Sequence, residues 1–138
     1  MREIEFRGQT RKFGEKIYAD GSPKESNWEY GGFTQGIGNY SVIYSYEKND
    51  KFVVYADTVG QYTGLKDKNG TKIFEGDILK GTIVSQWAKE EIVCYVEYQR
   101  DSFVCISENK CKHKLMFAKD IEVIGNIYDN PELLKAGA

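Results

Sequence analysis

The sequence predicts a mainly β protein, and three observations support this prediction. Its 138 residues include fourteen glycines but only two prolines, a ratio that favours many tight turns between short strands. Nearly every periodic segment alternates polar and apolar residues, as strands with one buried face do. The expected strands recur at intervals of about 8–16 residues with short turns between them. We therefore expect a small β-barrel or a curled sheet rather than a helical bundle.

The first half of the chain is expected to form an irregular, aromatic-rich β region. Ile4 and Phe6 alternate with charged residues and predict a first strand with one buried face. Residues 19–27 (ADGSPKESN) combine Asp-Gly, Ser-Pro and mixed charges, which predicts a loop. A strand pair follows, with its turn at residues 47–50. One face of the first of these strands would carry mainly tyrosines that pair across the ladder: Tyr40, Val42, Tyr44 and Tyr46.

The second half is expected to be a more regular antiparallel ladder. Asn69-Gly70 is a strong hairpin signal, because both central positions of a type I′ turn need positive φ. Ile73, Ile78 and Leu79 would start the core of this part. Further strands are expected at residues 78–84, 91–98, 103–107 and 121–127.

The C-terminal end of the chain carries two local signals. Gly125 interrupts the last apolar strand, as expected at a bulge or a close strand crossing. Asn130 and Pro131 fit the cap and the first turn of a short terminal helix. We place a domain boundary near residues 57–60. The β region, residues 1–60, would pack on a barrel-like unit with a terminal helix, residues 61–138.

Composition indicates a cytoplasmic protein whose net charge points to no particular partner. The formal net charge is −2, which gives no overall attraction to nucleic acid or to an anionic membrane. The N-terminus lacks the apolar core of a secretory signal, and no apolar run is long enough to span a bilayer. The three cysteines, Cys94, Cys105 and Cys111, suit reduced thiols in a cytoplasm.

Two long blocks of sequence stand out by their turn residues. The first is QYTGLKDKNGTKIFEGDIL, residues 61–79, and the second is IEVIGNIYDNPELL, residues 121–134. Together with the opening MREIEFRG, residues 1–8, they resemble the YopX family of bacteriophage and prophage proteins. The resemblance implies a small β-rich phage protein whose C-terminal part is an SH3-like barrel. It implies no established enzymatic activity and offers no catalytic residues to carry over.

Candidate sites for metal or catalytic chemistry are sparse. Glu75 and Asp77, two residues apart on an extended chain, could hold a hard cation or act as acid and base, although acidic groups at a turn commonly cap backbone amides. Cys105, Cys111 and His113, with Cys94, are fragments of a zinc site without its usual paired spacing. His113 is the only histidine available for a nucleophilic pair. We therefore expect no enzyme, no metal and no cofactor.

Basic and aromatic residues suggest a nucleic-acid alternative. Lys110, Lys112, His113 and Lys114 form the densest basic patch. A second group surrounds the expected hairpin, where lysines and aromatic residues could together bind single-stranded nucleic acid. Acidic residues stand among the same lysines, so this alternative is not favoured. The residues of the second group and of its aromatic partners are Lys66, Lys68, Lys72, Lys80, Tyr62, Phe74 and Phe117.

Trp28 and Trp87 are expected in loop-like segments, where a Trp side chain either covers a core or anchors an interface. Together with the many tyrosines they favour self-association. The first hypothesis is therefore a non-enzymatic, homo-oligomeric protein-interaction module that serves a phage or prophage as an accessory protein. Its partner would be a second copy of the chain, or else a protein of the phage or of the host. No membrane binding is expected. The alternatives are single-stranded nucleic-acid binding and, third, a metal-binding protein or enzyme.

Overall fold

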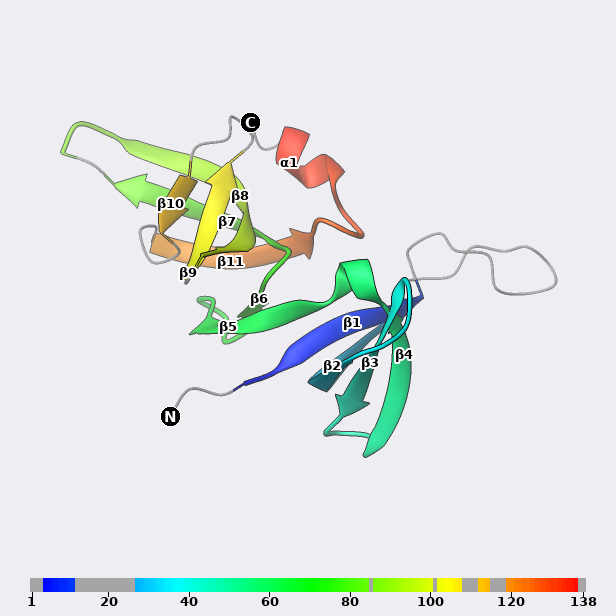
Figure 1. The fold of residues 1–138 in the computed structure, drawn as a ribbon. Helices are drawn as coiled ribbons and strands as arrows, with labels where there is room; N and C mark the ends of the chain where they lie inside the picture. The colour runs from blue at the N-terminus through cyan, green and yellow to red at the C-terminus, as the bar shows by residue number, and fades with distance from the viewer. Residues whose placement is uncertain are drawn as a thin grey trace, which may run out of the picture. The chain divides into compact units, whose positions relative to one another are not determined.

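The computed structural model describes residues 4–11, 27–84, 86–100, 102–107, 112–114 and 119–136. The chain divides into two compact units, residues 1–62 and 63–138. Antiparallel strands make up most of both units, and the described part of the second unit contains one five-residue helix (Figure 1). The predicted mainly β class is confirmed.

The first unit is an antiparallel sheet with the strand order β4-β3-β2-β1-β5. The pairing of β2 with β3 and of β3 with β4 runs without interruption, so this region is more regular than its sequence suggested. The hairpin expected around residues 40–55 is confirmed. The strands are β1 (Phe6–Arg11), β2 (Asn27–Gln35), β3 (Tyr40–Ser45), β4 (Asp50–Tyr55) and β5 (Gly60–Lys66), with a 3-10 turn, η1 (Ala56–Thr58), before β5.

The sheet of the first unit curls so that β1 approaches β4. A Cβ atom added to Gly8 would lie 2.7 Å from Cγ2 of Val54. The hydroxyl of Thr58 accepts a hydrogen bond from the Gln9 amide (2.9 Å) and donates one to the Tyr55 carbonyl (2.7 Å). The hydrogen bonds of Thr58 tie Gln9 in β1 to Tyr55 at the end of β4. The contact of Gly8 with Val54 shows that little room is left between the two strands.

The expected first strand begins later than its alternation suggested. Ile4 precedes β1 and is 65% exposed, so its predicted place on a buried face is wrong. Phe6 does begin the strand, and its ring packs against that of Phe33 with 5.3 Å between centroids. Alternation over so few residues identified a strand but not its bounds.

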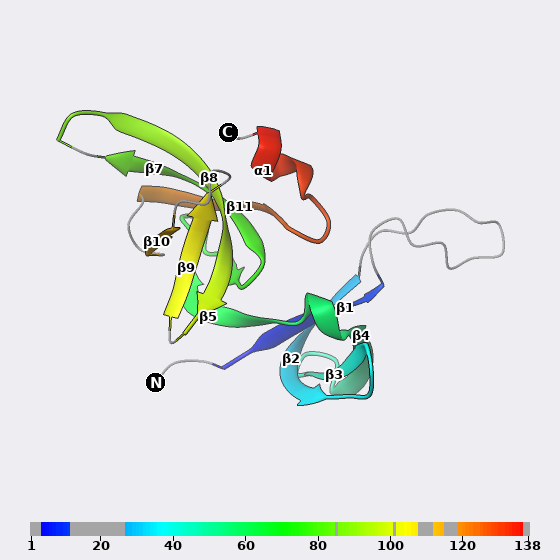
Figure 2. The ribbon, with the colours of Figure 1, turned by 45° about the horizontal axis from the view of Figure 1, so that its top comes forward.

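The second unit contains a five-stranded antiparallel sheet with the order β10-β9-β8-β7-β11 (Figure 2). The second half of β5 pairs with the short β6 (Lys72–Phe74). Within the described ranges no ladder joins β10 to β11, so the sheet is open there and the expected SH3-like barrel is not closed. The sheet consists of β7 (Asp77–Val84), β8 (Lys89–Gln99), β9 (Ser102–Ser107), β10 (Lys112–Lys114) and β11 (Lys119–Asn126), and the helix α1 (Glu132–Ala136) follows.

The core of the second unit is built from β6, β7, β8 and β9. Its central side chains are almost fully buried and come from strands distant in sequence. The predicted core positions Ile73, Ile78 and Leu79 are confirmed, with exposed fractions of 2% or less. The fully assembled cluster comprises Ile73, Leu79, Cys94, Val96 and Cys105.

The hairpin at Asn69-Gly70 is confirmed, but its turn type differs from the prediction. Gly70 has φ +82°, whereas Asn69 is not among the residues with positive φ. The Gly70 amide donates to the Asp67 carbonyl (3.0 Å), and the Asp67 amide donates to the Thr71 carbonyl (2.8 Å). This is a type I turn followed by a left-handed glycine, so only one position requires positive φ.

The C-terminal segment confirms one local prediction and corrects another. The ladder of β11 with β7 shifts register between Val123 and Gly125, which is the expected bulge. A Cβ at Gly125 would meet Asn130 Oδ1 at 2.7 Å and Leu133 Cδ1 at 2.9 Å. Asn130 is not an ordinary helix cap, because its side-chain oxygen accepts a hydrogen bond from the Asn126 amide (3.3 Å), which precedes it.

Candidate functional site

The acidic residue at the hairpin turn, Asp67, joins two distant segments of the second unit. Its Oδ1 accepts hydrogen bonds from the amides of Asn69 and Thr71, both at 2.9 Å. Its Oδ2 accepts a third from the amide of Val123 in β11 (3.0 Å). The Lys68 amide adds a bond to the Ile121 carbonyl (2.9 Å). The turn thereby covers the edge of β11 that β7 leaves open.

The electrostatics of Asp67 follow from this arrangement. Burial alone raises the pKa of its carboxyl group, but the hydrogen bonds from Val123, Thr71 and Asn69 outweigh burial and hold the pKa below its usual value. The group is thus ionised and saturated with backbone donors. It is a structural carboxylate rather than a free acid or base.

Of the predicted acidic pair, Glu75 and Asp77, the second residue is buried and bonded to the backbone. Asp77 is 2% exposed, and its Oδ2 accepts a hydrogen bond from the Phe74 amide (2.7 Å) across the turn between β6 and β7. It therefore caps a backbone amide, the alternative weighed for acidic turn residues. Groups of three or more potential metal ligands are absent from the part of the chain that the structure describes.

The two blocks that carry the family resemblance meet in the second unit. The ladder between β7 and β11 pairs Asp77 with Asn126 and Leu79 with Val123. The Gly76 amide donates to Val96, and the Gly76 carbonyl accepts from the Ile127 amide (2.9 Å). Residues that are distant in sequence thus form one corner of the fold. Their turn chemistry builds this corner and leaves no open cluster of polar side chains.

Two of the three cysteines lie in the core, as their strand positions predicted. Cys94 and Cys105 are 3% and 1% exposed and are both reduced. The hydrogen bond that the Cys105 thiol donates to Cys94, together with burial, raises the pKa of Cys105, which keeps this thiol protonated. Backbone pairing sets His113 opposite Cys105 in the ladder of β9 with β10. Cys111 lies outside the described residues.

The basic surface predicted for nucleic acid loses its aromatic component. Tyr62 and Phe74 are 4% and 3% exposed, so neither can stack on a base, and the prediction for them is wrong. Phe117 and Lys110 lie outside the described residues. Lys112 and Lys114 are placed by their backbone alone, as the flanking residues of His113 in β10.

Trp28 lies in strand β2, not in a loop as predicted. It is partly buried, and the guanidinium carbon of Arg7 lies 4.5 Å from the centre of its ring. This cation–π contact joins β1 to β2 within the first unit, where Gln9 and Trp28 are register partners. Trp28 therefore belongs to the packing of the first unit.

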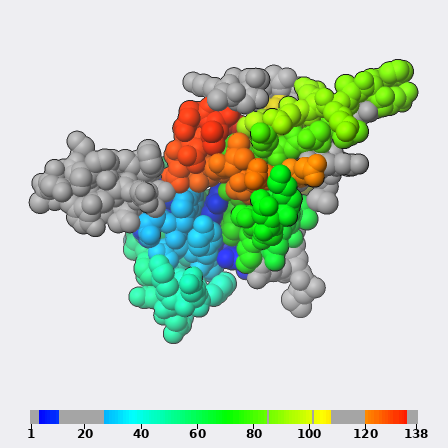
Figure 3. Space-filling model, turned by 180° about the vertical axis from the view of Figure 1, so that it is seen from behind, coloured from blue at the N-terminus to red at the C-terminus, as the bar shows by residue number. Residues whose placement is uncertain are grey.

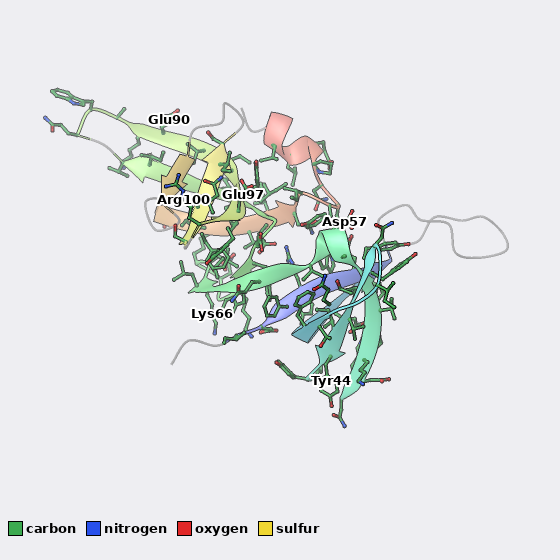
Figure 4. The ribbon with its side chains drawn as sticks, viewed as in Figure 1. Tyr44, Asp57, Lys66, Glu90, Glu97 and Arg100 are labelled. Carbon is green, nitrogen blue, oxygen red and sulfur yellow. The ribbon has the colours of Figure 1, made fainter. Side chains whose placement is uncertain are left out.

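Trp87 lies in the loop between β7 and β8, as predicted, and its side chain is 86% exposed. The hairpin around it, residues 82–91, is called the arm below. The arm projects from the second unit in Figure 3, and Figure 4 labels Glu90 upon it. Its pairing continues to Val84 and Lys89, and Val84 is 47% exposed. An apolar tip thus stands on a paired, two-stranded support.

A second exposed aromatic surface covers the sheet of the first unit. In β3 the alternate residues Ser41, Ile43 and Ser45 are at most 4% exposed, so the intervening residues face outward. We call this outward face of β2, β3 and β4 the tyrosine face; Tyr44 is labelled on it in Figure 4. Register pairing assigns it these residues: Tyr30, Gly32, Thr34, Tyr40, Val42, Tyr44, Lys51, Val53 and Tyr55.

The tyrosine face is aromatic, and much of it is open to solvent. Tyr30, Tyr40 and Tyr44 are 41%, 49% and 38% exposed. Tyr40 and Tyr55 pair across the ladder with 5.6 Å between ring centroids, which confirms the expected cross-strand pairing. Tyr46, in the turn after β3, is 62% exposed and lies over Gly32, since a Cβ there would meet its hydroxyl oxygen at 3.3 Å.

Sequence reasoning grouped these tyrosines on one face and counted them in favour of self-association, but it did not identify the three-stranded surface that they form. The signal was present in the order YSVIYS, residues 40–45, where serines alternate with the tyrosines. Aromatic residues are usually assigned to the buried side of such a strand. Here β1 lies so close to β4 that space on the inner side is limited. The small side chains of Ser41 and Ser45 fit there.

Comparison with known proteins identifies the family. A model of the family described as YopX protein matches residues 5–135, nearly the whole chain. The chain belongs to the YopX family. Membership of the YopX family confirms the resemblance drawn from residues 61–79 and 121–134.

Among solved structures, one similar chain covers nearly all of this YopX-family chain. Protein EF1440 from Enterococcus faecalis is similar over 97% of this chain and 99% of its own, with 23% sequence identity and a TM-score of 0.47. No curated protein sequence matches the YopX-family chain. In the described ranges, the chain has no helix long and apolar enough to cross a membrane.

Proposed function

We propose that this YopX-family protein is a non-enzymatic, homo-oligomeric interaction module that serves a phage or prophage in the cytoplasm of its bacterial host. The proposal rests on the exposure of Trp87, whose side chain is 86% exposed at the tip of the arm. Trp is among the residues most enriched at the energetic centres of protein interfaces. A support of paired strands presents it with little loss of conformational entropy on binding.

Energetics favour a symmetric contact over a single inserted side chain. Burying one Trp removes about 150–250 Å² from water, which contributes roughly 4–6 kcal/mol before association costs. Association itself costs about 4–15 kcal/mol, so one Trp alone would not hold a complex. In a two-fold dimer every contact occurs twice. Two copies of Trp87, together with the neighbouring Val84, would therefore bury enough apolar surface to offset the cost.

The charges of the second unit support a role without catalysis. The carboxylates of Asp67 and Asp77 are engaged by backbone amides. The buried, reduced thiols of Cys94 and Cys105 share a hydrogen bond in the core. These four polar groups are thus used by the fold, while Trp87 and Val84 of the arm are exposed.

Sedimentation equilibrium of the wild type and of Trp87→Ala tests this proposal. We expect the wild type to sediment as an oligomer and Trp87→Ala to shift toward the monomer mass. Ile37→Ala is the matched control, because Ile37 is also a large apolar residue and is 92% exposed in the first unit. It should leave the mass unchanged. A wild type that stays monomeric at its highest soluble concentration, or an unaltered mass for Trp87→Ala, would overturn the proposal.

A further inference from the structure

The tyrosine face offers flat aromatic rings at fixed spacings. Alternate residues of one strand lie about 6.8 Å apart, so Tyr40 and Tyr44 stand about 14 Å apart along β3. Across the ladder, Tyr55 adjoins Tyr40, and Lys51 is the register partner of Tyr44. Along β3 the face therefore presents two separate aromatic positions, and the one at Tyr44 lies beside a cation.

The tyrosine face also excludes negative charge. Of its nine residues Lys51 alone is charged, and no carboxylate belongs to it. The acidic residues of the same strands, Glu29 and Asp50, alternate to the opposite side. Glu29 is 3% exposed there and forms an ion pair with Lys48 (2.8 Å). An anionic ligand would thus meet a cation and aromatic rings on this face.

We propose that the tyrosine face binds single-stranded nucleic acid by stacking bases on Tyr40 and Tyr44. Stacking on aromatic side chains is tolerant of sequence because every base has a π-face. Lys51 would contact the phosphate backbone between stacked bases. A second copy fits the face less well, because it would bring two Lys51 ammonium groups together without a carboxylate from the face. This site belongs to the first unit, whereas the lysines of β10 belong to the second.

Such a site has a distinctive dependence on salt. Each phosphate neutralised on a single strand contributes about −0.7 to the slope of log K against log salt. With Lys51 as the exposed cation of the face, we expect a slope near −0.7. A site made by the several lysines around the hairpin and β10 would give a slope several times steeper.

Fluorescence anisotropy with a labelled oligothymidylate of about ten nucleotides tests the proposal. We expect Tyr40→Ala and Tyr44→Ala each to weaken binding roughly tenfold. Tyr40→Phe keeps the ring and should bind as the wild type does. Lys51→Gln should flatten the salt dependence. Tyr98→Ala is the matched control, because Tyr98 is 45% exposed in the second unit, and it should leave binding unchanged.

Three results would overturn the proposal. The first is no binding of the oligonucleotide at low salt. The second is competition by heparin as effective as by unlabelled oligothymidylate, with the tyrosine variants indistinguishable from wild type, which would show binding by charge alone. The third is dimerisation that Tyr44→Ala abolishes while nucleic-acid binding is absent, which would make the face an interface between copies. Circular dichroism of each variant would establish that it is folded.

Discussion

At the scale of single residues, Asp67 is the side chain on which the second unit depends most visibly. One carboxylate receives three backbone N–H groups, two from its own turn and one from β11. No neutral side chain of the same size can accept all three. Removing the carboxylate leaves buried donors without acceptors, which costs about 1–3 kcal/mol for each donor that water cannot reach.

We expect Asp67→Ala to lower the free energy of unfolding by roughly 2–4 kcal/mol. Urea unfolding followed by circular dichroism measures this change. Asn69→Ala is the control in the same turn, because the Asn69 side chain makes only an exposed contact of 3.4 Å with Glu122. It should cost no more than about 0.5 kcal/mol. Equal losses for the two variants would contradict the role assigned to the carboxylate.

The same residue predicts a dependence on pH. The pKa of Asp67 is lower in the folded protein than its usual value of 3.8, so the unfolded state takes up the proton first as pH falls. The stabilisation is therefore fully present above the unfolded pKa and is lost as pH falls through the folded pKa. Urea unfolding at several pH values measures the free energy of unfolding of the wild type and of Asp67→Asn. The difference between them should shrink in acid. A difference in free energy of unfolding that stays constant with pH would refute the role of the ionised Asp67 carboxylate.

At the scale of elements, the pairing of β2 with β3 shows how a close approach of two backbones requires glycine at one position. Gly31 has φ +154°, and a Cβ there would lie 1.8 Å from the Tyr44 carbonyl oxygen. This approach belongs to the inner side of the curled sheet, where Gly31 is the register partner of Ser45. The small residues on that side allow the curl, and the curl in turn directs the tyrosines outward.

Gly31→Ala should therefore destabilise the first unit severely, by more than about 3 kcal/mol, or prevent its folding, because the obstacle is backbone rather than a movable side chain. Gly38→Ala is the control. Gly38 also has positive φ, +63°, but nothing lies within 4 Å of an added Cβ. It should cost only about 1–2 kcal/mol. Thermal unfolding by circular dichroism compares the two, and similar melting temperatures would contradict the argument.

At the scale of the whole molecule, each unit buries a different kind of interior. The first unit buries Ser41, Ser45 and Gln9 beside Ile43 and Val54, whereas the second has an apolar cluster that includes Cys94 and Cys105. Reaching these two thiols requires opening the sheet of the second unit. Their reactivity is therefore a measure of how that unit opens.

In a Cys111→Ser background, native Cys94 and Cys105 should react with a thiol reagent on the order of 10³-fold more slowly than in urea, since only the rare open state exposes them. Spectrophotometric labelling measures the rates. Prompt labelling of both thiols under native conditions would show that the cluster is not closed.

Residue patterns alone predicted the class of fold, the hairpins, the core residues Ile73, Ile78 and Leu79, and the family. These follow from local chemistry, because period-two alternation and turn residues act over a few positions. Three features came from the packing of distant segments: the bond between Asp67 and Val123, the burial of Tyr62 and Phe74, and the outward direction of the tyrosines. Alternation divides a strand into two faces, but the strands that pack against it select the buried one. That choice depends on neighbours distant in sequence, such as Gly8 against Val54.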